Sequence, residues 1–194
     1  MSMPSTDLVC NKCGFSGSDD VVWGDFRYVE GDREIPLSRT LGWCADCSDF
    51  APIEDFAIKD RLLAEIERTL RSIKVRTKRW ASFSLLKSTR KDRLDELERL
   101  SALIGHLALI GERNGSERCL QCGSVNVERF DGNYSELDSF GSDERTINTG
   151  FYHPGCGGEF LASVNPARFS IIFHPKFYSM DGYRLDGCNN PDLV

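Results

Sequence analysis

Four short pairs of metal-ligating residues stand out in this chain of 194 residues. Three are cysteine pairs with a gap of two residues, and in the fourth a histidine takes the first position. Thiolate and neutral imidazole are ligands that Zn²⁺ prefers, and a gap of two residues lets one tight turn direct both side chains at one ion. The pattern predicts structural zinc. The pairs are Cys10/Cys13, Cys44/Cys47, Cys119/Cys122 and His153/Cys156.

The spacing of these pairs predicts which of them share an ion. Thirty residues separate Cys13 from Cys44, and thirty separate Cys122 from His153. Adding 109 to the residue numbers of the first two pairs gives the residue numbers of the last two, which indicates an internal duplication. We therefore expect two zinc ions per chain, each held by neighbouring pairs. These are a Cys₄ site of Cys10, Cys13, Cys44 and Cys47, and a Cys₃His site of Cys119, Cys122, His153 and Cys156.

The stretches CNKCGF, CLQCGS and HPGCGG resemble the knuckles of the zinc-ribbon superfamily. The resemblance covers residues 8–50 and 117–165 and implies two β modules, each closed by zinc. His153 departs from the four cysteines that are usual in ribbons, and the linkers exceed the common length of about 15–20 residues. Because ribbons serve transcription, translation, enzymes and scaffolding alike, the resemblance implies a fold and a metal but no role.

The segment between the two halves has a helical period. Apolar residues recur at this spacing from Ile58 to Ile73 and again after Leu94. We expect an antiparallel helical hairpin, in which residues 74–87 either extend the first helix or form the loop. The second helix carries two apolar stripes, of which the second widens the apolar face. The first stripe is Leu94, Leu97, Ser101, Ile104 and Ala108, and the second is Leu100, Leu103, Leu107 and Ile110.

Together these patterns predict an α+β protein of three parts. Residues 1–52 form an N-terminal Cys₄ ribbon, residues 53–115 form a basic helical hairpin, and residues 116–194 form a C-terminal Cys₃His ribbon. Residues 159–178 are rich in strand-forming residues, which predicts a β extension of the last ribbon.

Charge is distributed unevenly along the chain. The net charge is −6, yet residues 59–93 hold twelve basic against four acidic side chains, so that this stretch is +8 and the remainder is −14. A basic segment with an aromatic residue is typical of a contact surface for nucleic acid or for another protein. The alternative interpretations are a solvated helical face, or a basic middle segment that docks against the acidic ends of the same chain. The candidate contacts are Arg71, Lys74, Arg76, Lys78, Arg79 and Trp80.

The sequence indicates no catalytic site, and His106, His174 and Cys188 lie outside the ligand pairs. Four ligands per ion leave no open position for a substrate, and no catalytic triad or phosphate-binding glycine loop is present, so we do not expect an enzyme. His106 lies in an apolar helical stretch and is interpreted as a core residue, whereas His174 carries no predicted chemistry. Cys188 is interpreted as a bystander, although it competes with His153 for the fourth ligand position.

These expectations favour a non-enzymatic protein-interaction module. An adaptor fits this description, and so does an inhibitor or immunity-type protein whose acidic ends complement a basic partner. The alternative is a nucleic-acid-binding protein that uses the basic segment. No apolar run approaches the roughly 20 residues of a membrane span, and no secretory signal is evident at the N-terminus, so we expect a cytoplasmic protein without a membrane partner. In that reducing compartment the high cysteine content of the chain indicates metal binding rather than disulfides.

Overall fold

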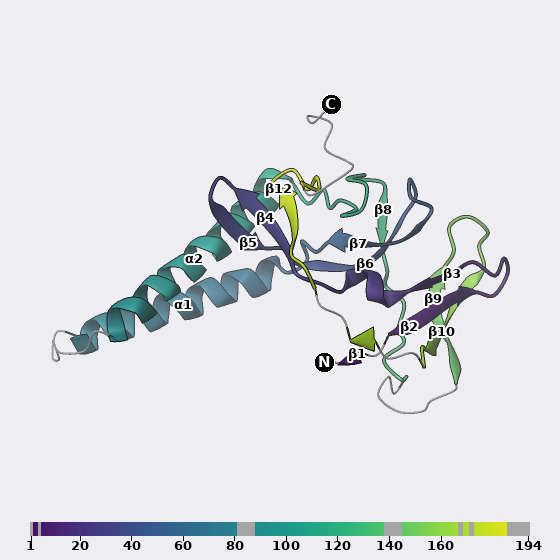
Figure 1. Cartoon of the computed structure of the whole chain (residues 1–194), viewed down its shortest axis with the longest axis horizontal. Coiled ribbons are helices and arrows are strands. Elements are labelled where there is room, and N and C mark those ends of the chain that lie inside the picture. Colours follow the sequence, from purple (N-terminus) through teal and green to yellow (C-terminus); the bar gives the residue numbers. More distant parts are fainter. Residues whose placement is uncertain are drawn as a thin grey trace.

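The computed structural model describes residues 2–3, 5–80, 88–137, 145–166, 169–170 and 173–185, with the side chains of 5–74, 94–137, 145–166 and 173–185. A pair of long helices projects from a body of small β-sheets, so the α+β prediction is confirmed (Figure 1). The helices are α1 (Lys59–Trp80) and α2 (Ser88–Glu112), and a short 3₁₀ helix spans Asp19–Val22.

The strands that the structure describes form four sheets, which combine distant parts of the chain. The largest has the order β3-β2-β10-β9, and two others have the orders β12-β4-β5 and β7-β6-β8. The pair β1-β11 forms the fourth sheet. The strands are β1 (Ser2–Met3), β2 (Thr6–Cys10), β3 (Ser16–Ser18), β4 (Phe26–Glu30), β5 (Arg33–Pro36), β6 (Arg39–Cys44), β7 (Asp49–Glu54), β8 (Val127–Arg129), β9 (Thr146–Tyr152), β10 (Glu159–Val164), β11 (Phe169–Ser170) and β12 (Lys176–Ser179).

Two β-hairpins carry ligand pairs at their turns. The turn between β6 and β7 holds Cys44 and Cys47 and closes with Ser48 at a φ of 52°. The turn between β9 and β10 holds His153 and Cys156 and closes with Gly157 at a φ of 69°. A left-handed residue at this point lets the chain reverse after the second ligand, so the turn directs both ligand side chains to the same side.

The helical hairpin is antiparallel, as predicted. Residues 74–80 extend α1, while residues 81–87 lie outside the described chain. Between the helices the Ser72 hydroxyl donates to Glu96 at 2.9 Å, and Arg99 forms an ion pair with Glu65. After α2 the chain turns through left-handed Asn114 and Gly115, which ends the helix before the third ligand pair.

The two apolar stripes of α2 have different environments. Of the second stripe, Ile110 is buried and Leu100, Leu103 and Leu107 are half-buried. The first stripe contributes little to the core, because its Leu94, Leu97 and Ile104 are 52 %, 43 % and 50 % exposed. The apolar face of α2 is therefore wider than the surface that the helix buries. A helix held between one neighbouring helix and one strand buries only the sides that face them.

A buried ion pair joins the base of the helical hairpin to the sheets. Glu54 at the end of β7 is fully buried and receives two charge-assisted hydrogen bonds from Arg113. The Tyr28 hydroxyl donates to the same carboxylate at 2.7 Å, and the backbone N–H of Arg118 donates at 2.8 Å. Four donors satisfy the carboxylate, which a buried charge requires. This contact fixes the chain immediately before Cys119.

Candidate metal centres

The structure brings the eight predicted ligands together in two groups of four. Within each group the ligand atoms lie within 4.8 Å of one another. The predicted sharing between neighbouring pairs is wrong, because each group takes one pair from each half of the chain. One group is Cys10, Cys13, His153 and Cys156, and the other is Cys44, Cys47, Cys119 and Cys122. One group is still Cys₃His and the other is still Cys₄, as predicted. The difference is that the Cys44/Cys47 pair and the His153/Cys156 pair have changed places between the two groups.

Strand pairing explains the exchange. β2 ends at Cys10 and pairs antiparallel with β10, so that Cys10 lies opposite Phe160 just beyond the turn that carries Cys156. In the other group Cys119 bridges to Ile53 of β7, and the N–H of Leu120 donates to the carbonyl of Pro52 at 2.8 Å. The turn with Cys10 and Cys13 therefore lies beside a hairpin from the second half of the chain. The turn with Cys119 and Cys122 lies beside a hairpin from the first half.

The cost of joining distant pairs is small. The segment between Cys13 and His153 has 139 residues, and that between Cys47 and Cys119 has 71, instead of 30 in each predicted site. Loop-closure entropy grows only with the logarithm of length, so these longer loops cost about 1.4 and about 0.8 kcal/mol more. The backbone hydrogen bonds of β2 with β10 and of the 118–120 segment with β7 offset a cost of this size.

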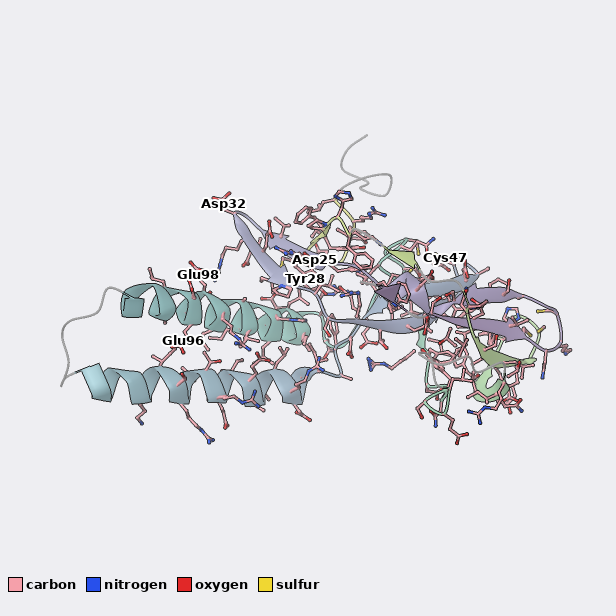
Figure 2. All side chains as sticks on the ribbon, turned by 60° about the horizontal axis from the view of Figure 1, so that its bottom comes forward. Asp25, Tyr28, Asp32, Cys47, Glu96 and Glu98 are labelled. Atoms are coloured by element: carbon pink, nitrogen blue, oxygen red, sulfur yellow. The ribbon has the colours of Figure 1, made fainter. Side chains whose placement is uncertain are left out.

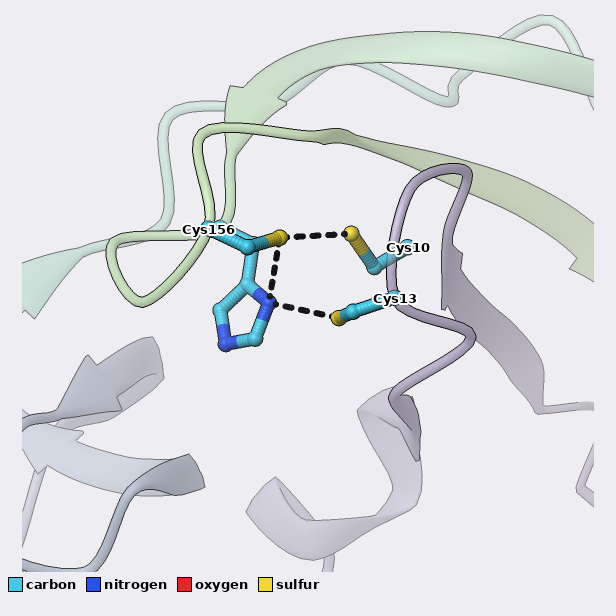
Figure 3. Close-up of side chains that lie close together, drawn as sticks. Cys10, Cys13 and Cys156 are labelled. Atoms are coloured by element: carbon cyan, nitrogen blue, oxygen red, sulfur yellow. Dashed lines mark hydrogen bonds between the residues drawn. The ribbon is translucent and has the colours of Figure 1, made fainter.

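The Cys₃His centre is compact (Figure 3). The Cys10 and Cys156 sulfurs lie 3.4 Å apart, and His153 Nδ1 lies 3.1 Å from the Cys13 sulfur and 3.3 Å from the Cys156 sulfur. A tetrahedron with Zn–S of about 2.3 Å and Zn–N of about 2.0 Å places sulfurs about 3.8 Å apart and sulfur about 3.5 Å from nitrogen. The four donor atoms are therefore already close to the separations that one ion imposes, and Nδ1 is the imidazole atom that faces it.

Aromatic rings and a glycine position the ligands of this centre. The His153 ring packs against Trp43 at 4.8 Å and against Phe15 at 5.3 Å between centroids. A Cβ on Gly158 would lie 2.5 Å from the Cβ of Lys12 and 2.7 Å from the Cys10 sulfur. Only glycine fits there, a requirement that sequence reasoning missed although Gly157-Gly158 directly follows the fourth pair.

The Cys₄ centre is more deeply buried. Cys44 and Cys119 are fully buried, and the sulfur separations are 3.6 Å for Cys44 and Cys122 and 3.9 Å for Cys47 and Cys119. The backbone N–H of Gln121 donates to the Cys119 sulfur at 3.4 Å. These separations again match a tetrahedral thiolate site.

Individual ligand thiols differ in acidity. Burial raises the pKa of Cys119 to about 12. At Cys10 burial also acts to raise the pKa, but backbone N–H groups of Cys13 and Lys12 bond to its sulfur, and the net effect is a pKa lowered to about 6. Cys10 thus favours the thiolate at neutral pH, whereas Cys119 becomes a thiolate only when a cation replaces its proton.

Among the remaining candidate residues, those that the structure describes are not gathered into a site. Arg71 is exposed and pairs with Glu67 at 2.9 Å, and Lys74 is also exposed. The side chains of Arg76, Lys78, Arg79 and Trp80 lie outside the described residues, as does Cys188. His106 is buried, as expected of a core residue, and burial lowers its pKa although Asp55 opposes the shift. His174 is exposed in the segment before β12.

No protein-family model matches the chain, and no curated protein or solved structure resembles it closely enough to count as a relative. Among the described residues, no helix is both long enough and apolar enough to cross a membrane. The two ligand groups therefore rest on the geometry of this chain alone.

Proposed function

We propose that this chain is a non-enzymatic protein-interaction module held in shape by two structural zinc ions. The observation that carries the proposal is the completeness of both ligand groups, each of which supplies four protein ligands. A catalytic zinc keeps a position for water or substrate, and four protein ligands fill the tetrahedron. Sulfur and imidazole donors favour zinc over the hard cations Mg²⁺ and Ca²⁺.

The positions of the two groups fit a scaffolding role. An ion in the Cys₃His group would link the turn after β2 to the β9–β10 hairpin, and an ion in the Cys₄ group would link the β6–β7 hairpin to the segment after α2. Both links join parts of the chain that are far apart in sequence. A body cross-linked in this way holds the projecting helical hairpin in a fixed orientation (Figure 1).

The charge of the chain favours a protein as partner. Outside residues 59–93 the chain carries −14, and thiolate coordination would add to the negative charge. Such a surface repels phosphates and complements a basic protein. An adaptor subunit, or an inhibitor or immunity-type protein that covers a basic target, fits these properties.

Co-purification tests the proposal. Tagged wild-type chain is isolated from its native cells with and without nuclease treatment, and bound zinc is measured by elemental analysis. We expect two zinc ions per chain and a stoichiometric protein partner that survives nuclease. A Cys44→Ser/Cys119→Ser variant, which lacks the buried centre, should lose that partner. Nucleic acid as the only bound species, or one zinc or less per wild-type chain, would contradict the proposal.

A further inference from the structure

A groove runs between strand β5 and helix α2. It consists of two adjoining hollows of about 550 Å³ each, which share Ile35 and Ala102 as lining residues. The outer hollow lies between the tip of the β4–β5 hairpin and Leu94, Leu97 and Glu98 of α2. The inner hollow continues to Leu62 of α1 and His106 of α2. From Leu94 to His106 the groove is about 18 Å long at the helical rise of 1.5 Å per residue.

The accessible apolar side chains of this β5–α2 groove lie in its outer hollow. Leu94 and Leu97 line its outer hollow while 52 % and 43 % exposed. Leu37, Leu62 and Leu103 line the inner hollow, where Leu37 and Leu62 are buried and where Arg61 and the Arg99–Glu65 ion pair also contribute to the lining. Large apolar side chains that are exposed to water beside a hollow can be buried when a partner binds there. At the inner end His106 Nε2 is buried and has no hydrogen-bond partner within the described part of the chain.

The rim of the outer hollow has an excess of negative charge. Glu34 forms an ion pair with Arg27, and Arg33 lies 3.8 Å from Glu30. Asp32 and Glu98 form no ion pair with any residue that the structure describes. Figure 2 shows Asp32 at the hairpin tip and Glu98 on the side of α2 below it, whereas Glu96 lies between the helices.

We propose that the β5–α2 groove binds an apolar segment of a partner protein that places a lysine or arginine beside Asp32 and Glu98. This inference rests on the proposed function, because it names the surface and the partner chemistry of the interaction module. An extended segment of about five residues or a helix of about twelve spans 18 Å. Phosphates would be repelled at this rim, and a second copy that presents the same groove would bring like charges together.

Peptide selection on the zinc-loaded full chain tests the groove. A phage library of random 12-residue peptides should yield peptides that combine leucine or isoleucine with lysine or arginine. Binding of a selected, fluorescently labelled peptide should weaken at least about tenfold in Leu97→Ser, which lowers the apolar surface. The Asp32→Lys/Glu98→Lys variant should weaken it by at least as much and should select peptides rich in aspartate or glutamate instead.

A matched control separates the groove from general charge effects. Glu112→Lys/Asp131→Lys makes the same change in net charge at exposed residues that do not line the groove, and binding should stay within about twofold of wild type. Zinc content and far-ultraviolet circular dichroism of every variant report on folding. The proposal is overturned if no peptide is enriched, if the groove variants bind like wild type, or if Leu97→Ser changes only self-association of the chain.

The two proposals fail in different ways. If Asp32→Lys/Glu98→Lys still retains the co-purified protein partner, the groove is refuted while the interaction function stands. If wild-type chain retains only nucleic acid, the interaction function is refuted whatever the selected peptides do.

Discussion

Replacement of one ligand distinguishes the observed ligand groups from those that the sequence predicts. In His153→Ala the Cys₃His group loses its imidazole donor, while the Cys₄ group is unchanged. Structural zinc contributes about 10–16 kcal/mol in zinc-finger peptides, so an equal share for one of four ligands is about 2.5–4 kcal/mol. That loss corresponds to roughly 10²- to 10³-fold weaker binding. We therefore expect zinc to fall from two ions per chain to one in the presence of a competing chelator.

Cysteine alkylation then identifies which thiols were released. Zinc-loaded His153→Ala is treated with N-ethylmaleimide, and each cysteine is quantified by peptide mass spectrometry. Cys10, Cys13 and Cys156 should become reactive, with exposed Cys13 the fastest, whereas Cys119 and Cys122 should stay protected. The His153→Cys variant restores a fourth ligand and should protect all of them. Labelling of Cys119 and Cys122 with Cys10 and Cys13 still protected would refute the observed grouping in favour of the spacing rule.

Three further measurements examine the surrounding structure. Glu54→Ala should lower the free energy of unfolding by about 3–5 kcal/mol in urea titrations, because it leaves the Arg113 charge buried without its partner, whereas Glu67→Ala at an exposed pair should change it by under about 0.5 kcal/mol. Burial lowers the pKa of His106 in the folded chain. As the pH falls below about 6.5, this imidazole is therefore protonated in the unfolded chain before it is protonated in the folded chain. The unfolding free energy should therefore decrease more steeply between pH 7 and pH 5 in wild type than in His106→Asn; equal slopes would contradict this assignment. Gly158→Ala should cost one zinc ion per chain, because its Cβ would collide with the Cys10 sulfur, while Gly111→Ala, which meets nothing within 4 Å, should retain two.

The sequence by itself determined the chemistry of the ligands. Cysteine and histidine pairs with a gap of two residues define turns that direct two donors at one point, and this depends only on residues adjacent in the chain. The helical hairpin is also a local property, since the period of apolar residues is set by 3.6 residues per turn. Both features were therefore visible before any tertiary contact was known.

Tertiary structure alone decided which pairs share an ion and which face of α2 is buried. Every pairing of the four ligand pairs offers sulfur and imidazole donors, and the differences in loop-closure entropy amount to only about 1–2 kcal/mol. The pairing of β2 with β10 and of Cys119 with Ile53 selects one arrangement. Likewise the two stripes of α2 are similarly apolar, and only the positions of α1 and β5 leave Leu94 and Leu97 exposed. Contacts between residues distant in sequence settle such choices, because a pattern within one segment specifies what a residue can bind but not which distant segment lies beside it.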